Sequence, residues 1–467
     1  MSILAAAAVP HPPLIMPEVG RGDERGIQAT IDAYREVSRR IFELRPELVI
    51  VSSPHTTMYA DYFHVSPGSA ASGSFANFRA PGLKVSASYD TDFVNALERL
   101  CAKNDVPAGT KAEREPWLDH ATMIPLRFLR DIYEENGIEP SYKVARVGLS
   151  GLSPAMHYKL GTLIAQTVAL LNRRAVYIAS GDLSHKLKSD GPYGFAKEGP
   201  VFDSECMASL GSGDFLRLLS MDSDLCEGAA ECGLRSFWIM AGALDRKSVT
   251  AEQLSYEGPF GVGYGVAYFT VGGKDESRNI GEQLDALTKK NMAERKNAED
   301  PYVKLARSSI ESFVRTGEIK DLPTGIPDEI TSKKAGAFVS LKKDGRLRGC
   351  IGTFLPTQPN LAMEIWGNAV SACSRDPRFS PVEEDELDDI VYSVDVLTEP
   401  EPIESEAELD PKVYGVIVSC GSRRGLLLPD LAGVDTVEEQ ISIARQKGGI
   451  RPNEKVTLHR FKVVRHH

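Results

Sequence analysis

Apolar runs of strand length alternate with amphipathic stretches of helical spacing through the first 272 residues. The runs SILAAAAV (2–9) and ELVIVSS (47–53) predict strands, and IQATIDAYREVSRRIFEL (27–44) predicts a helix between them. The same alternation continues through a predicted strand at RAVYIAS (174–180) and ends in a glycine-rich strand, FGVGYGVAYFTVGG (260–273). It predicts an α/β fold in which helices surround a largely parallel or mixed sheet.

The pattern changes near residue 273. Residues 273–297 are highly charged and poor in large apolar side chains, and they predict a linker that is partly helical. A helix that Pro301 can open follows, and then shorter strands mixed with helices, which predicts a smaller α+β domain over 298–467. Because 467 residues exceed what one hydrophobic core usually serves, two domains, 1–272 and 298–467, are expected.

Composition narrows the classes of function. The net charge of −11 disfavours a nucleic-acid partner, and no apolar run reaches the ~18 residues that a membrane span needs. The start of the chain lacks the basic region of a signal peptide. Seven cysteines without a C-x-x-C pair indicate neither a disulfide framework nor a structural zinc site. A protein of the reducing cytoplasm is therefore expected, free of membrane and nucleic acid.

Polar side chains follow three of the predicted strands. His11 comes after the first strand, His55 after the second, and Asp182 and His185 after the strand that ends at Ser180. Parallel strands bring their carboxyl ends to one edge of a sheet, where α/β folds build their sites. Histidines that converge with a carboxylate are typical of non-haem iron(II) centres, although Asp182 could instead cap the turn after its strand. A shared metal site is the expectation.

Five motifs occur in a fixed order over about residues 1–272. They are VPHPPL, SSPH, LDHATMIPL, SGDLSHK and AAECGLRSFWIMAGAL. Together they resemble the LigB-type class III extradiol ring-cleavage dioxygenases and their Memo-like relatives. The resemblance implies a small aromatic substrate, a catechol or aminophenol, and dioxygen as the second substrate.

The resemblance also implies the metal ligands. His11 and His55 match the two histidine ligands, while Glu231 and Cys232 compete for the third place in the ECG stretch. Dioxygenases of this class use a glutamate late in the domain, and Memo-like proteins have a cysteine there. An oxygen donor completes the iron(II) triad, so Glu231 and Fe(II) are expected. With Cys232 as the ligand, zinc or another divalent metal becomes the alternative.

Four further residues are expected to carry the chemistry. The resemblance implies that His185 takes a proton from the substrate and that Asp119 and His120 form an acid/base pair, with His120 donating a proton as the ring opens. Asp182 adds a titratable group that a pure binding module does not need. The alternative function is a Memo-like metal- or peptide-binding module without ring cleavage.

The second domain contains a cysteine between glycines in GRLRGCIGTF (345–354). Arg346 and Arg348 could lower the thiol pKa of Cys350, although a small packed residue is the expected role. Asp376 and Arg378 stand in the loop SRDPRFSPV. If a pocket is present, these two stretches should line it, and Arg348 and Arg378 could hold an anion by paired hydrogen bonds.

The LRGCIG and DPRF-x-PV motifs carry a second resemblance, to AMMECR-type domains, over about residues 298–467. That family is α+β and has no established activity, so no catalytic residue follows from it. AMMECR-type, Memo-like and radical SAM proteins occur together as a system. The fusion therefore implies a radical SAM protein as a partner, and it is compatible with a homo-oligomer.

Overall fold

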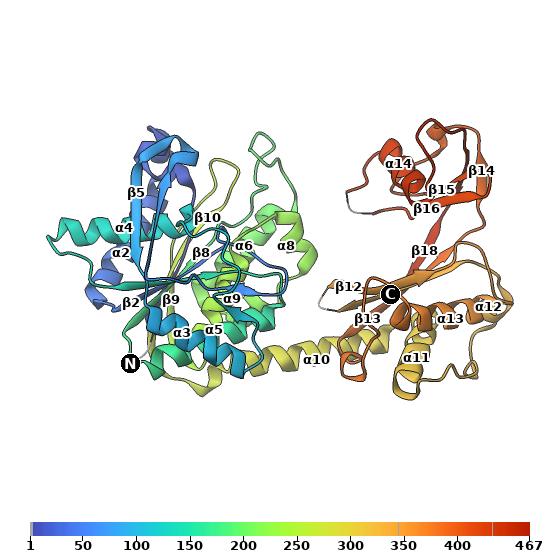
Figure 1. Ribbon diagram of the computed structural model, residues 1–467, viewed down its shortest axis with the longest axis horizontal. Coiled ribbons are helices and arrows are strands. Elements are labelled where there is room, and N and C mark those ends of the chain that lie inside the picture. Colours follow the sequence, from blue (N-terminus) through green and yellow to red (C-terminus); the bar gives the residue numbers. More distant parts are fainter. Residues whose placement is uncertain (1–2, 344, 432) are drawn as a thin grey trace. The chain divides into compact units, whose positions relative to one another are not determined.

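The computed structural model describes residues 3–343, 345–431 and 433–467 (Figure 1). Contacts divide the chain into two compact units, one ending at Leu287 and the other beginning at Thr288. Within the described residues, no helix combines the length and the apolar character that crossing a membrane requires.

A six-stranded sheet forms the centre of the first unit. The strand order is β7-β2-β8-β1-β10-β9. The strands are β1 (Ile3–Val9), β2 (Leu48–Ser53), β7 (Lys143–Gly148), β8 (Ala175–Ser180), β9 (Lys247–Glu257) and β10 (Tyr264–Lys274). Strands β7, β2, β8 and β1 are parallel to one another, and β10 and β9 add an antiparallel edge. The sheet is mixed, and the predicted α/β class is confirmed.

Helices cover both faces of this sheet, so its central strands are buried on both sides (Figure 1). In β1, Ala6 and Ala8 pack into one core while Ala5 and Ala7 pack into the other, as the two-residue repeat of a strand requires. The helices on the first face are α3 (Thr91–Lys103), α5 (Pro154–Leu170), α6 (Glu198–Ser212) and α9 (Leu234–Ala243). Those on the second are α2 (Gln28–Leu44) and α4 (His120–Glu135).

Shorter elements complete the first unit. The helices are α1 (Pro17–Gly20), α7 (Phe215–Leu219) and α8 (Ser223–Ala229). The strands are β3 (Phe63–His64), β4 (Ala70–Phe75), β5 (Ala80–Ser88) and β6 (Ala108–Gly109), and β4 and β5 form a hairpin. Single 3₁₀ turns span Pro13–Ile15, Asp23–Ile27, Ala76–Phe78 and Glu276–Arg278.

The charged stretch 273–297 contains the end of β10 and most of helix α10 (Ile280–Ala298). Ile280 and Leu284, in the first turns of α10, pack against the core of the first unit. The side chains of the following turns are mostly exposed, as their charge requires.

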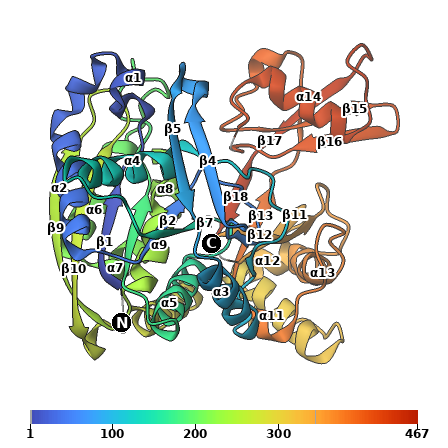
Figure 2. The same cartoon turned by 60° about the vertical axis from the view of Figure 1, so that its left-hand side comes forward.

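Two four-stranded antiparallel sheets form the second unit (Figure 2). The first, β12-β11-β13-β18, contains β11 (Ala337–Lys343), β12 (Arg346–Gly352), β13 (Ile390–Leu397) and β18 (Val463–His466). The second, β14-β17-β15-β16, contains β14 (Glu401–Ile403), β15 (Gly415–Cys420), β16 (Arg423–Leu427) and β17 (Thr457–Phe461).

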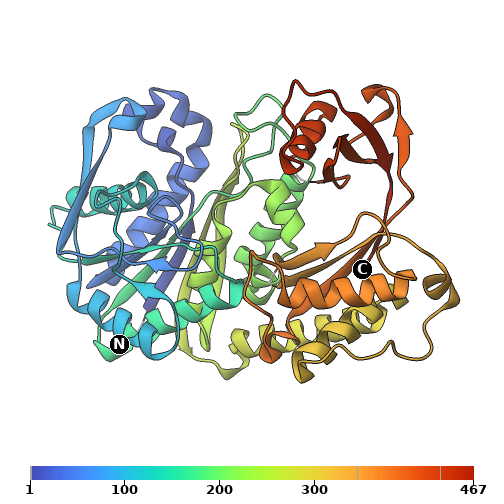
Figure 3. The same ribbon diagram turned by 45° about the vertical axis from the view of Figure 1, so that its right-hand side comes forward.

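Each of these sheets has its own helices and its own core. Helices α11 (Pro301–Thr316), α12 (Asp328–Ser332) and α13 (Leu361–Ser374) share a core with the first sheet, and α13 and α11 lie side by side in Figure 3. Helix α14 (Val437–Lys447) packs on the second. Two 3₁₀ turns span Glu384–Glu386 and Glu406–Glu408.

Candidate functional site

The ends of three adjacent parallel strands bring the predicted histidines together. His11 follows β1 and His55 follows β2, and β8 lies between these two strands. The Nε2 atoms of His11 and His55 are 3.0 Å apart. His11 is buried, and its Nδ1 lies 3.1 Å from the hydroxyl of Ser180, the last residue of β8. The two imidazoles therefore face one point at the carboxyl edge of the sheet, as expected.

Cys232 adds a third donor to this point. Its Sγ lies 3.6 Å from His11 Nε2, and one donor atom from each of His11, His55 and Cys232 lies within 4.8 Å of the others. A close backbone approach places the cysteine here: a Cβ on Gly181 would lie 2.1 Å from the Cα of Gly233. Only glycine at position 181 lets the Cys232 turn reach the end of β8.

Glu231 does not join these donors. Its carboxylate accepts a hydrogen bond from the backbone N–H of Leu234 at 2.6 Å, where α9 begins. The first N–H groups of a helix need such an acceptor, so the Glu231 side chain is turned toward the helix end. Among the described residues, the structure thus places Cys232 beside the histidines, against the expectation that Glu231 would be the third ligand.

Asp182 and His185 border the same point from the loop after β8. With Cys232 they form a second group whose donor atoms lie within 4.8 Å of one another. Asp182 accepts the backbone N–H of His11 at 2.7 Å, and its other oxygen is 3.8 Å from His11 Nε2. Burial raises the pKa of Asp182 to about 6. Burial also lowers the pKa of His11 well below its ordinary value, and neighbouring His55 adds to this.

Asp119 and His120 stand at the start of α4, and the ring of His120 lies near both His11 and His55. The Asp119 carboxylate caps the helix through the N–H of Thr122 and accepts a hydrogen bond from Ser53 at 2.7 Å. Burial opposes its charge, but the bond from Ser53 and the positive charge of Arg146 leave its pKa below the ordinary value. The ring of His120 lies 4.3 Å from that of His55, and burial lowers its pKa to about 3.

Two residues that the sequence pattern did not mark support this arrangement. Arg146 is 1% exposed on β7, and its guanidinium lies 3.5 Å from Asp119 while donating to the carbonyl of Trp117 at 2.6 Å. It thereby fixes the loop that leads into α4. Tyr193 lies against the imidazole of His185, with ring centroids 5.1 Å apart. For Arg146, the only signal in the sequence was a single arginine within the apolar run KVARVGL.

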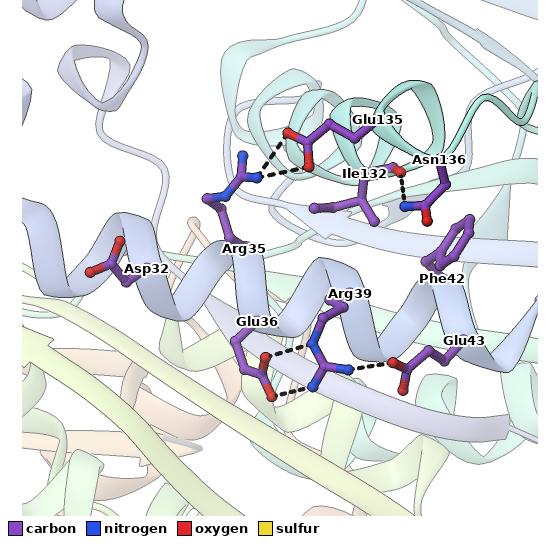
Figure 4. Close-up of a pocket in the computed structure, with 9 residues that line it drawn as sticks. All are labelled: Asp32, Arg35, Glu36, Arg39, Phe42, Glu43, Ile132, Glu135 and Asn136. Carbon is purple, nitrogen blue, oxygen red and sulfur yellow. Dashed lines mark hydrogen bonds and ion pairs between the residues drawn. The ribbon is translucent and has the colours of Figure 1, made fainter.

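A surface recess of about 480 Å³ lies between α2 and α4, and none of the site residues lines it (Figure 4). Its two arginines are paired with carboxylates of the same recess: Arg35 binds Glu135 at 2.8 Å, and Arg39 binds Glu36 at 2.8 Å. Paired charges at an open surface leave little to recognise a ligand, so the histidine cluster is the candidate site.

The two motif stretches of the second unit lie side by side. The backbone N–H of Cys350 donates to Asp376 at 2.9 Å, and the guanidinium of Arg378 binds both Asp376, at 2.7 Å, and the carbonyl of Cys350, at 3.2 Å. The thiol of Cys350 lies 3.2 Å from the hydroxyl of Ser340. The hydrogen bonds from Arg378 hold the pKa of Asp376 well below its usual range.

Both arginines expected to hold an anion already have carboxylate partners. Arg378 pairs with Asp376, and Arg348 pairs with Glu386 at 2.7 Å and donates to the carbonyl of Ser380 at 2.8 Å. The sequence-predicted residues are thus brought together, but the contacts of their guanidinium groups tie β12 to the loop after α13.

We expect Glu386→Gln to lower the free energy of unfolding by about 1–3 kcal/mol at pH 7. Hydrogen bonds from Arg348 lower the pKa of Glu386 from 4.5 to about 2. The stabilisation is therefore complete above about pH 4.5 and is lost as the pH falls toward 2. Urea unfolding of the full chain across this range measures it. Glu384→Gln, at an exposed neighbour, is the matched control; an equal effect of both variants would refute the pair's contribution.

Comparison with known proteins gives these residues a context. The model of the family described as the catalytic LigB subunit of aromatic ring-opening dioxygenase matches residues 5–267. The chain belongs to the LigB family. The AMMECR1 model matches residues 303–466 of the same chain, so a LigB domain is fused to an AMMECR1 domain, as the motifs indicated.

Similar proteins match all or part of this chain. The protein CA_C1420 of Clostridium acetobutylicum is 42% identical over 100% of this LigB chain and 99% of its own length. A Thermotoga maritima protein is 57% identical over 36% of this chain and 98% of its own. A crystal structure of a Pyrococcus horikoshii protein, 34% identical, covers 35% of this chain and 88% of that one, with a TM-score of 0.33.

Proposed function

We propose that the LigB domain is a metal-dependent enzyme that opens the ring of a catechol- or aminophenol-like substrate with dioxygen. The observation that carries the proposal is the cluster of His11, His55 and Cys232, with the acid/base residues around it. A family named for aromatic ring-opening dioxygenases supports the same chemistry. We assign no activity to the AMMECR1 domain.

The donor set fits a transition metal ion. Imidazole nitrogen suits iron, zinc and copper, and a thiolate extends the choice toward metals that prefer sulfur. Asp182 brings an oxygen donor 3.8 Å from His11 Nε2, which keeps iron(II) as our first candidate, with zinc as the alternative. A bound ion would act as a Lewis acid toward the hydroxyl or amino groups of the substrate.

The surrounding histidines would move protons. Burial lowers the pKa of both His185 and His120, so each imidazole is neutral at pH 7 and can accept a proton at a ring nitrogen. His185 is the base for the substrate hydroxyl. His120 with a pKa near 3 can donate a proton only after it has first accepted one, which places it later in the reaction.

Metal content after anaerobic purification, followed by oxygen uptake with a panel of catechols and 2-aminophenol, tests the proposal. Stoichiometric iron and oxygen consumption with at least one member of the panel are the expected results. A fully metal-loaded protein that consumes no oxygen with any of them would refute ring cleavage on these substrates.

One observation favours a second candidate function. The thiol of Cys232 beside the histidines matches the Memo-like pattern, in which the cleft holds a metal or a peptide without ring cleavage. A radical SAM protein would then be the partner that acts on what this module binds. Stable metal binding without oxygen uptake, together with retention of that partner on the full chain, would support this function over catalysis.

A further inference from the structure

The loop between β8 and α6 exposes two aromatic side chains beside the candidate site. Tyr193 is 61% exposed and Phe195 is 57% exposed. Of the two, Tyr193 has a described ring contact with a site residue. Its ring centroid lies 5.1 Å from that of His185, and the two rings are tilted by 34°. Tyr193 thus presents a large apolar ring to solvent next to the residue proposed to act as base.

Backbone contacts hold this loop in place. Leu187 and Phe195 form an antiparallel bridge, and the N–H of Leu187 donates to the carbonyl of Gly261 at 3.1 Å. Lys188 binds the carbonyl of Pro259 at 2.7 Å. The loop is therefore pinned to the turn between β9 and β10, and the Tyr193 ring is presented on a fixed support.

Two other loops at this edge expose large apolar side chains close in sequence to site residues. Met58 follows His55 by three positions, and Trp117 precedes Asp119 by two. Such side chains, on loops that carry site residues, are available to contact an apolar ligand that enters the site. The ligand that best covers an exposed phenol ring beside an imidazole is a flat aromatic ring, which can stack on both.

We propose that Tyr193 is a specificity-determining residue whose ring stacks against the planar ring of the substrate. This inference rests on the proposed function, since it places an aromatic substrate at the histidine cluster. Aromatic pairs add to affinity beyond the area that they bury, by about a factor of 2 to 10. Tyr193 would therefore select flat aromatic diols over saturated diols of the same size.

Binding of 4-nitrocatechol to the cobalt(II)-loaded full chain tests this inference without turnover. We expect Tyr193→Leu to weaken 4-nitrocatechol binding about 2- to 10-fold and Tyr193→Phe to change it less than about twofold, because only the first removes the ring. Phe195→Leu, on the same loop with similar exposure, is the matched control and should behave like the wild type. cis-Cyclohexane-1,2-diol should bind wild type and Tyr193→Leu equally.

The outcomes separate this inference from the proposed function. Failure of the wild type to bind cobalt(II) would overturn both. Cobalt(II) binding with no affinity for 4-nitrocatechol would overturn the role of Tyr193 and the aromatic substrate, while the metal site stands. Equal 4-nitrocatechol affinity in Tyr193→Leu and wild type, or an equal loss in Phe195→Leu, would overturn the stacking role alone.

Discussion

Cys232→Ser is expected to lower the affinity for cobalt(II) at least about 100-fold and to abolish the thiolate-to-cobalt charge-transfer absorption. Loss of a residue that only orients a metal ligand lowers the metal affinity up to about 100-fold. Loss of the ligand itself should lower it at least as much. His11→Ala and His55→Ala should abolish binding in the same way, because the three donor atoms lie within 4.8 Å of one another. Titration of the metal-free chain, followed by absorbance, measures both effects.

Glu231→Gln is the matched control, since it changes the adjacent residue and keeps its size. Its carboxylate faces the start of α9, so this variant should keep the cobalt affinity and lose only some stability. The reverse pattern, in which Glu231→Gln loses the metal and Cys232→Ser keeps it, would restore the glutamate as the third ligand and contradict the geometry.

His185→Ala should leave the metal content unchanged and lower turnover about 10²–10⁴-fold, the usual contribution of general acid–base catalysis. His185 lies at the edge of the donor cluster, and its backbone N–H donates to the carbonyl of Ala229 at 3.0 Å. Oxygen uptake with the most active catechol measures turnover.

Metal analysis of the same His185→Ala preparation decides its role. Added imidazole should restore part of the activity if the missing group is a base. Loss of the metal from this variant would instead make His185 a ligand, together with Asp182 and Cys232, and the assignment of His11 and His55 as the principal ligands would have to be revised.

Strand ends were the part of the site that sequence could predict. Buried parallel strands have continuous apolar runs, so β1, β2 and β8 were recognisable and their following histidines could be placed at one edge. Strand β9 was not predicted. Its sequence, KSVTAEQLSYE, lies at the sheet edge and contains few large apolar residues, so it lacks the run that marks a buried strand.

The choice between Glu231 and Cys232 could not be made from sequence. Adjacent residues in a turn point in different directions, and which one meets His11 depends on how closely Gly233 approaches Gly181. The pairing of Arg348 was equally hidden, because Glu386 lies 38 positions away in a separate 3₁₀ turn. Such contacts follow from tertiary packing, for which local patterns carry no signal.

The position of β1 in the sheet has a consequence for biosynthesis. This strand leaves the ribosome before the other strands of its sheet, yet its two neighbours are β8 and β10, and β10 is the last strand of that sheet to be made. Until Tyr264–Lys274 has emerged, the alanine-rich strand that precedes His11 keeps an open edge. Such distant pairing slows folding and leaves a nascent chain open to aggregation. Chaperone holding during translation would protect this edge.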